Sequence, residues 1–211
     1  MKIKVFEKTK GCAPKEFENG DWVDLCTAKD IWLKGPEATT LKYSTKKSPK
    51  TEEERLKKRD VVFQSALIPL GVCIEVPKGY ESVILPRSST FKKWGLMQSN
   101  SEGLVDFSYN SEYDEWKLPV VATRDTFIPK GTRIAQFRVQ LSQKATAWQK
   151  LKWLFSGPMK IVMVDRLENK PRGGFGEGTD NASPKPKNPK TKKNDEDIDQ
   201  PVQKEAQGQG E

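Results

Sequence analysis

The chain has 211 residues, a length that fits one well-cored domain, and its formal net charge of +8 favours an anionic partner or serves only solubility. It contains no histidine, which excludes Ser-His and Cys-His nucleophile pairs, a histidine general base, and histidine-ligated zinc or iron. Three widely spaced cysteines argue against a disulfide framework, and no apolar run is long enough for a membrane span, so we expect a protein of the reducing cytoplasm with no membrane partner.

Short apolar runs separated by Gly and Pro predict β-strands along most of the chain. The clearest alternation places Ala135, Phe137 and Val139 on one face of a strand and Gln136 and Arg138 on the other. Few segments show helical periodicity, so we predict an all-β sandwich or barrel. In chain order the predicted strands are residues 2–6, 66–77, 80–86, 134–141 and 160–165.

Two segments predict short helices. The first spans 88–95, with serines at the capping end and Gly95 where the helix would stop. The second spans 145–155 and places Trp148, Leu151 and Phe155 on one face. We expect that face to pack into the core; the alternative is an exposed aromatic surface for a partner.

Two charged segments lie outside this pattern. Residues 44–60 form an insertion, which we expect to be a solvated loop or a short exposed helix rather than a nucleic-acid contact. Residues 182–211 carry six lysines and six acidic residues with almost no apolar residues, so we expect a disordered tail. Because the tail is neutral, the surplus positive charge lies in the first 181 residues.

Several polar residues stand where chemistry is possible. The stretch "GLVDFSYN" puts Asp106 three residues before Tyr109 in a strand-like run, so the carboxylate either lies in a surface turn or does chemistry. Without histidine, a base must be Asp, Glu, Lys, Tyr or Cys, and a metal must prefer oxygen ligands, most simply Mg²⁺.

Three further segments offer ligand-binding groups. "PRSS" combines Arg87, Ser88 and Ser89 at a helix start, which forms either a phosphate cradle or ordinary capping. Gln136 lies on the polar face of its strand, and the glycine-rich run 171–179 is a linker or an arm that offers Arg172 and the ring of Phe175. Asp21 and Asp24 lie close together near the start of the chain. One of them would bind a water molecule of a metal ion, and the other would lie in a turn.

The order of these segments resembles the trimeric dUTP pyrophosphatase (dUTPase) family. An early Asp24 is followed by PRSS, N-x-x-G-L-V-D-x-x-Y, G-x-R-I-A-Q and R-G-G-F-G, from about Gly20 to Thr179. The combination of "PRSSTFKKWGLMQSNSEGLVD", "DEWKLP" and "GTRIAQFR" looks most like phage-type members of the family from Gram-positive hosts. The resemblance implies a jelly-roll-like β-barrel in residues 1–181, whose C-terminal arm, about 166–181, is exchanged within a homotrimer.

The resemblance also implies a reaction and a role for each matching residue. The reaction is hydrolysis of dUTP to dUMP and pyrophosphate with Mg²⁺, with Asp106 as the base that activates water. Tyr109 would lie under the deoxyribose and exclude a 2′-hydroxyl, and Arg172 and Phe175 would close over the site from a neighbouring chain. The uracil would contact Asn100, Gly103 and Val105. The phosphates would be bound by Arg87, Ser88, Ser89 and Gln136. Asp24 would hold the metal through a water molecule.

The sequence departs from the common family pattern at a few positions. Ser108 replaces a second aspartate, Glu177 and Gly178 replace a Ser-Thr pair, and the phosphate contact is either Lys170 or Arg172. Three alternatives remain: a dCTP deaminase-like enzyme, a weakly catalytic nucleotide-binding protein that acts on an unknown protein through the tail or insertions, and a nucleic-acid binder. Nucleic acid is nevertheless not an expected partner.

Overall fold

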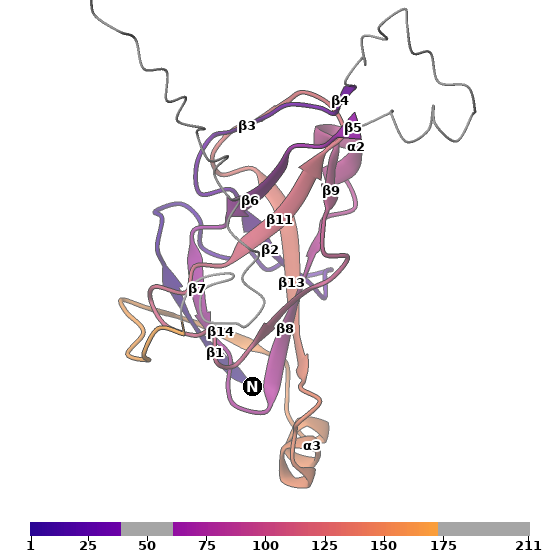
Figure 1. Cartoon of the computed structure of the whole chain (residues 1–211). Helices are drawn as coiled ribbons and strands as arrows, with labels where there is room; N and C mark the ends of the chain where they lie inside the picture. Colours follow the sequence, from indigo (N-terminus) through magenta and orange to yellow (C-terminus); the bar gives the residue numbers. More distant parts are fainter. Residues whose placement is uncertain (39–60, 173–211) are drawn as a thin grey trace, which may run out of the picture. The chain divides into compact units, whose positions relative to one another are not determined.

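Residues 1–38 and 61–172 are described in this computed structural model, and they are dominated by β-strands (Figure 1). The all-β prediction is therefore confirmed. The predictions for residues 44–60, Phe175, Glu177 and the 182–211 tail lie outside the described residues.

The strands are β1 Lys2–Glu7, β2 Val23–Cys26, β3 Ile31–Leu33, β4 Glu37–Ala38, β5 Val61–Val62, β6 Ser65–Pro69, β7 Val72–Glu75, β8 Tyr80–Pro86, β9 Leu96–Gln98, β10 Gly103–Asp106, β11 Lys117–Ala122, β12 Thr126–Ile128, β13 Arg133–Leu141 and β14 Lys160–Val164. The helices are α2 Thr90–Trp94 and α3 Ala147–Leu154.

The central sheet has the order β10-β8-β13-β2, with antiparallel neighbours throughout. Strands β8 and β13 run side by side over their length, from Ala135 opposite Pro86 to Leu141 opposite Tyr80 (Figure 1). The predicted alternation in β13 is confirmed, because Ala135 and Phe137 are fully buried while Arg138 is exposed. This long pair is the scaffold to which most predicted site residues are attached.

Four smaller sheets complete the pairing in the described residues. Their orders are β14-β1-β7, β6-β11-β9, β12-β3 and β4-β5. Together with the central sheet they do not join into one continuous hydrogen-bonded barrel within residues 1–38 and 61–172. The core lies between the sheets, where the rings of Trp116 and Phe137 meet edge to face with centroids 5.2 Å apart. Each such buried ring stabilises the fold by about 1.5–3 kcal/mol.

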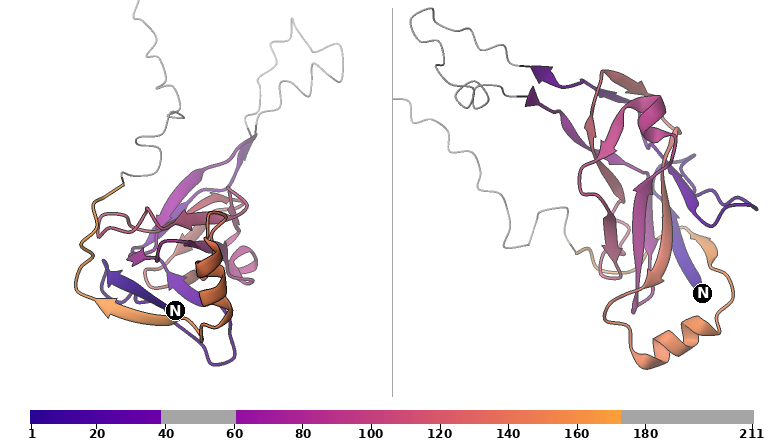
Figure 2. Two further views of the ribbon diagram at one scale, coloured as in Figure 1. Left: turned by 90° about the horizontal axis from the view of Figure 1, so that it is seen from below. Right: turned by 90° about the vertical axis from the view of Figure 1, so that its right-hand side faces the viewer.

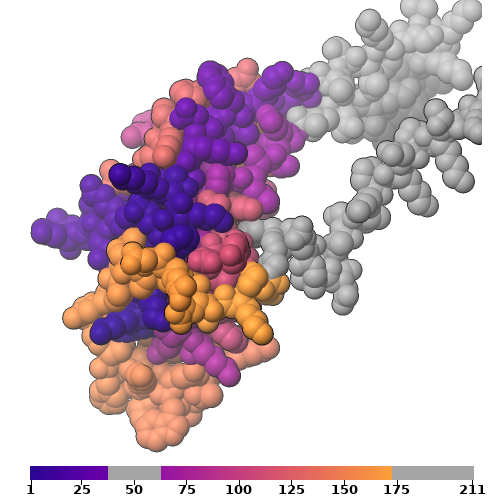
Figure 3. All heavy atoms as spheres, turned by 90° about the vertical axis from the view of Figure 1, so that its left-hand side faces the viewer, coloured from indigo at the N-terminus to yellow at the C-terminus, as the bar shows by residue number. Residues whose placement is uncertain are grey.

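The N-terminal strand links early and late parts of the chain. β1 pairs antiparallel with β7 and parallel with β14, with Ile3 opposite Ile161. Its alternation buries Ile3 and Val5 completely. The space-filling view shows the orange C-terminal segment lying against the indigo N-terminal one (Figure 3). This pairing brings the residues that follow β14 back to β7 and the neighbouring loops.

Both predicted helices are confirmed, with one correction. In α2, Gly95 ends the helix in the left-handed region at φ 65°, but the Ser89 side chain makes no capping hydrogen bond. In α3, the Thr146 hydroxyl and the Gln149 side chain form a reciprocal capping box. Figure 2 shows α3 at the far end of this part of the chain from β4 and β5.

The expectation that the aromatic face of α3 packs into the core is wrong for the single chain. Trp148 and Phe155 are each 79% exposed, and Leu151 is 45% exposed. The residue that does face the body is Trp153, whose ring lies 5.5 Å from that of Tyr80. Helical spacing predicted which residues share a face but not which face the body covers. Among the described residues, no helix is long and apolar enough to cross a membrane.

Candidate active site

Asp106 ends β10 and is followed at once by a tight turn. The turn is closed by the Tyr109 N–H, which donates to the Asp106 carbonyl at 3.2 Å. The Asp106 carboxylate accepts the Ser108 N–H at 2.9 Å and the Ser108 hydroxyl at 2.5 Å. The Arg172 guanidinium lies 3.2 Å from the same oxygen. The sequence offered a surface turn or chemistry for Asp106; the structure places it at the last position of β10, directly before the turn, with its side chain half-exposed, and this position allows both.

These contacts keep Asp106 ionised. Partial burial acts to raise the pKa of Asp106, but the two hydrogen bonds from Ser108 and the charge of Arg172 outweigh it and hold the pKa below the ordinary aspartate value. The carboxylate can therefore accept a proton at neutral pH. Ser108, which the sequence showed only as a departure from the family pattern, is thus part of the site.

The ring of Tyr109 is half-buried against the core, and its hydroxyl donates to the Glu115 carbonyl at 3.0 Å. Burial is the main reason that the pKa of Tyr109 rises to about 12, with Asp114 adding to the effect. The phenol therefore stays neutral and keeps its hydrogen bond. Core packing and the hydroxyl hydrogen bond therefore hold the Tyr109 ring in one position near Asp106.

The start of β10 forms a hairpin with exposed polar groups. Gln98 Nε2 donates to Asn100 Oδ1 at 2.8 Å and to the Ile84 carbonyl at 3.2 Å. A Cβ on Gly103 would stand 3.2 Å from both Gln98 Nε2 and the Ile84 oxygen, so glycine allows the close approach of β10 to β8. Val105 is buried beside this hairpin.

A second cluster gathers around Asp24. Its side chain is buried in β2, and Oδ2 lies 3.0 Å from Arg87 Nε and 3.3 Å from Arg133 Nη1. Two guanidiniums thus share one carboxylate, which leaves this cluster with net positive charge. Arg133 was part of a quoted motif, but no role was assigned to it, because its partner comes from a distant strand.

The predicted phosphate-binding groups lie beside this cluster. Gln136 is directly opposite Asp24 in the sheet, and its Nε2 donates to the Pro86 carbonyl at 3.4 Å. Ser88 is exposed and Ser89 is partly exposed, at the point where β8 gives way to α2. Because Ser89 does not cap the helix, its hydroxyl is available for a ligand.

Within one chain, Asp106 lies far from Arg87 and the cluster around Asp24. Asp106 stands opposite Glu81 in the β10–β8 pairing, whereas Arg87 follows the other end of β8. Arg87 is six positions beyond Glu81, and a rise of about 3.3 Å per strand residue separates the two by roughly 20 Å. Asp106 and Arg87 of the same chain therefore do not reach the same phosphate.

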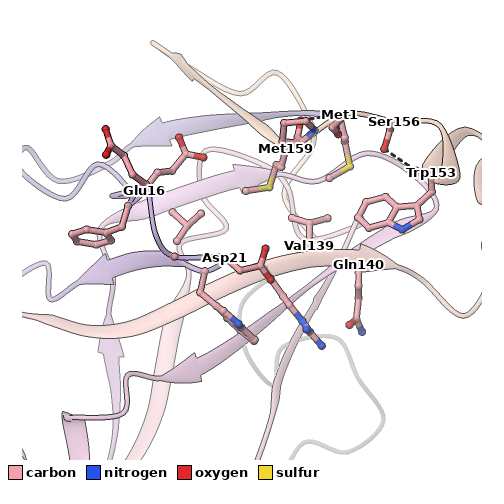
Figure 4. Close-up of a pocket in the computed structure, with 16 residues that line it drawn as sticks. Met1, Glu16, Asp21, Val139, Gln140, Trp153, Ser156 and Met159 are labelled. Carbon is pink, nitrogen blue, oxygen red and sulfur yellow. Dashed lines mark hydrogen bonds between the residues drawn. The ribbon is translucent and has the colours of Figure 1, made fainter.

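A cavity of about 900 Å³ lies elsewhere in the described part of the chain (Figure 4). Met1, Met159 and Trp153 line one end, and Glu16 and Asp21 line the other. Asp21, one of the two aspartates considered for a metal-bound water, lines this cavity, whereas Asp24, Arg87, Asp106 and Tyr109 do not. The two carboxylates that gather cationic side chains around them, Asp24 and Asp106, lie outside its lining.

The described residues offer Mg²⁺ few direct ligands. No three His, Cys, Asp or Glu side chains gather into a metal-holding cluster within the described ranges. Asp24 Oδ2 already faces two guanidiniums. Mg²⁺ at nucleotide sites keeps several waters and takes one or two carboxylates plus substrate phosphates. Within residues 1–38 and 61–172, the donor set therefore fits a metal that Asp24 contacts through water.

The chain resembles known proteins in sequence and fold. A protein-family model described as dUTPase matches residues 53–152. The SPbeta prophage-derived deoxyuridine 5'-triphosphate nucleotidohydrolase of Bacillus subtilis is 37% identical over 176 residues, which cover 83% of this chain and 95% of the relative. This chain belongs to the dUTPase family. The predicted likeness to phage-type members is confirmed by the prophage origin of that relative.

Two further comparisons support the family assignment and the fold. The deoxyuridine 5'-triphosphate nucleotidohydrolase of Hydrogenobaculum is 33% identical over 116 residues, covering 54% of this dUTPase-family chain and 70% of the relative. The dUTPase crystal structure from Streptococcus mutans aligns with a TM-score of 0.50 at 17% identity, over 70% of this chain and 100% of that one. At that identity the structural likeness shows the fold alone.

Proposed function

We propose that this dUTPase-family protein hydrolyses dUTP to dUMP and pyrophosphate, which lowers dUTP and supplies dUMP in the cytoplasm in which it is made. The observation that carries the proposal is the turn that joins Asp106 to Tyr109, with its ionised carboxylate and its fixed ring. In a chain without histidine, a half-exposed carboxylate is a chemically sound base for activating water.

In the proposed reaction, Asp106 accepts a proton from a water that attacks the α-phosphorus. The new O–P bond forms as the bond to the bridging oxygen of the β-phosphate breaks, and pyrophosphate leaves. Phosphoryl transfer asks a protein mainly for positioning and charge neutralisation. One oriented carboxylate and several phosphate donors are therefore sufficient.

In this proposal, the hairpin at the start of β10 and the Tyr109 ring select the substrate. Tyr109 lies under the deoxyribose in this proposal and leaves no room for a 2′-hydroxyl. Asn100 and the backbone from Gly103 to Val105 bind the uracil edge. The close approach of β10 to β8 at Gly103 supports this assignment, because a tight hairpin rejects the thymine methyl group.

The phosphates are assigned to the cationic cluster at the other end of β8. Arg87, Ser88, Ser89 and Gln136 contact them, and Asp24 reaches Mg²⁺ through water. When bound, Mg²⁺ neutralises charge on the triphosphate and aligns its oxygens. Arg172 is assigned to the γ-phosphate and Phe175 to the uracil face, as the arm closes.

Assembly follows from the separation along β8. A reacting water and its phosphorus must come within about 3–3.5 Å of each other, so the base and the phosphate donors must meet at one phosphate. The roughly 20 Å between them in one chain supports a site in which one chain supplies Asp106 and another supplies Arg87. We propose a homotrimer with three such shared sites.

The direct test is pyrophosphate release with Mg²⁺ from dUTP, UTP, dTTP and dCTP, for wild type and Asp106→Asn. We expect release from dUTP alone and a loss of about 10²–10⁴-fold in the variant. Ammonia release from dCTP would indicate a deaminase instead. Tight dUTP binding without pyrophosphate release would indicate a nucleotide-sensing protein.

A further inference from the structure

We propose that the loop from Asn110 to Trp116 positions both Tyr109 and the segment 169–172, and that Asp114 is its positioning residue. This inference rests on the proposed function, because it concerns how Tyr109 and Arg172 are held for dUTP. The sequence showed this loop only as an extension of the hairpin after Tyr109.

The loop is largely buried and hydrogen-bonded to its surroundings, although it carries several polar groups. Ser111 and Trp116 are fully buried, and Asp114 is 2% exposed. The Trp116 N–H donates to the Val72 carbonyl at 2.9 Å, and the Cys73 thiol donates to the Glu112 carbonyl at 3.2 Å. The loop is therefore fixed to β7 at two points.

Asp114 organises the interior of the loop. Its Oδ2 accepts the Ser111 N–H at 3.0 Å and the Ser111 hydroxyl at 2.8 Å. Its own N–H donates to the Ser111 carbonyl at 3.1 Å. A buried carboxylate is costly unless such donors satisfy it, so this reciprocal arrangement fixes the course of the backbone.

The fixed loop reaches the two groups that would contact substrate. The Glu115 carbonyl accepts the Tyr109 hydroxyl at 3.0 Å. On the other side, Asp114 Oδ2 accepts the Arg172 N–H at 3.5 Å, while the Arg172 side chain faces Asp106. The Asp114 carboxylate thus lies between the loop that holds the Tyr109 ring and Arg172, the last residue that the structure describes.

A second contact holds the same segment. Asn169 Nδ2 donates to the Asn110 carbonyl at 3.3 Å and to Glu75 Oε2 at 2.9 Å. Leu167 is buried just before it. Residues 167–172 therefore attach to the loop and to β7 of their own chain, which sets the point from which the glycine-rich run departs.

The test compares Asp114→Asn with Glu112→Gln, which removes one charge from the same loop at a side chain with no hydrogen bond among the described residues. Hydrogen–deuterium exchange of the peptide 166–172 and the KM and kcat for dUTP are measured on both. We expect Asp114→Asn to speed exchange and to raise KM roughly tenfold with kcat changed much less, and Glu112→Gln to change neither.

A second pair of variants tests the contact with the ring. Tyr109→Phe loses only the hydroxyl that Glu115 holds, and we expect the preference for dUTP over UTP to fall about three- to tenfold. If Asp114→Asn does not fold, Ser111→Ala replaces it, since it removes one 2.8 Å donor and keeps the carboxylate.

Unchanged exchange and KM in a folded Asp114→Asn or Ser111→Ala protein would overturn the inference, even if the variant melts earlier, because the residue would then be structural only. Faster exchange in the 166–172 peptide with the control unchanged supports it. If wild type does not hydrolyse dUTP, the proposed function fails, while the exchange comparison still decides whether Asp114 holds this segment.

Discussion

The Ser108 hydroxyl donates to the Asp106 carboxylate at 2.5 Å, from the position at which the common family pattern carries a second aspartate. A neutral donor in place of a second negative charge stabilises the ionised form of Asp106. Asp106 therefore stays ionised to a lower pH than an ordinary aspartate.

Ser108→Ala should move the acidic limb of the pH–rate profile to higher pH. The side-chain hydrogen bond from Ser108 lowers the pKa of Asp106, so its removal raises that pKa. Activity requires the ionised base and falls as pH drops through the pKa, so the fall in kcat/KM will begin at higher pH than in wild type. A limb at the same pH as in wild type would contradict this role of Ser108.

Gly103→Ala should weaken dUTP binding. The added Cβ would stand 3.2 Å from Gln98 Nε2 and from the Ile84 oxygen, so the Gln98 side chain and the β10–β8 backbone must give way by a few tenths of an ångström. We expect KM for dUTP to rise by about tenfold, the effect of roughly 1.4 kcal/mol. Gly157→Ala is the control, because its Cβ would meet nothing within 4 Å. Equal KM values for dUTP in the two variants would refute the assignment of this hairpin to the uracil ring of the substrate.

Asp24→Asn should destabilise the fold as well as the site. The substitution leaves Arg87 and Arg133 without their shared carboxylate, and the two guanidiniums repel each other. Fully buried pairs cost about 3–5 kcal/mol when broken; these arginines are partly exposed, so we expect a loss of about 2 kcal/mol. Urea denaturation measures it, with the exposed Asp21→Asn as the control. A loss no larger than that of the control would mean that solvent already screens the cluster.

The two tryptophans of α3 should respond in opposite ways. Trp153→Ala removes a ring that packs on Tyr80 and should lower the free energy of unfolding by about 1–3 kcal/mol. Trp148→Ala removes a ring that is 79% exposed and should change it by less than about 0.5 kcal/mol. A large loss for Trp148→Ala would mean that the assembled protein buries this face.

Most of the fold could be predicted from the sequence, because local patterns encode it. Alternation in residues 134–141 predicted β13, and Gly95 predicted the end of α2. The exposure of Trp148 could not be predicted, since periodicity does not say which surface covers a helix face. The nearness of Asp106 and Tyr109 could be predicted, because only three positions separate them in the sequence and one turn joins them.

The parts of the site that depend on pairing between distant strands were not predictable. Asp24 meets Arg133 across the β2–β13 pair and Arg87 from beyond β8, and no local pattern reveals such a cluster. Likewise, only the register of β10 on β8 shows that Asp106 and Arg87 lie at opposite ends of that strand. The roles given to the site residues themselves remain predictions.

The most direct test of the account mixes two inactive variants, Asp106→Asn and Arg87→Gln, co-expressed with different tags so that mixed assemblies can be isolated. If each site takes Asp106 from one chain and Arg87 from another, each isolated mixed trimer holds one intact site out of three and should show about one third of the wild-type dUTP hydrolysis. As a control, Asp106→Asn mixed with the double variant should restore none. Mixed assemblies that are no more active than either variant alone would contradict a shared site and, with it, the proposed arrangement of the active centre.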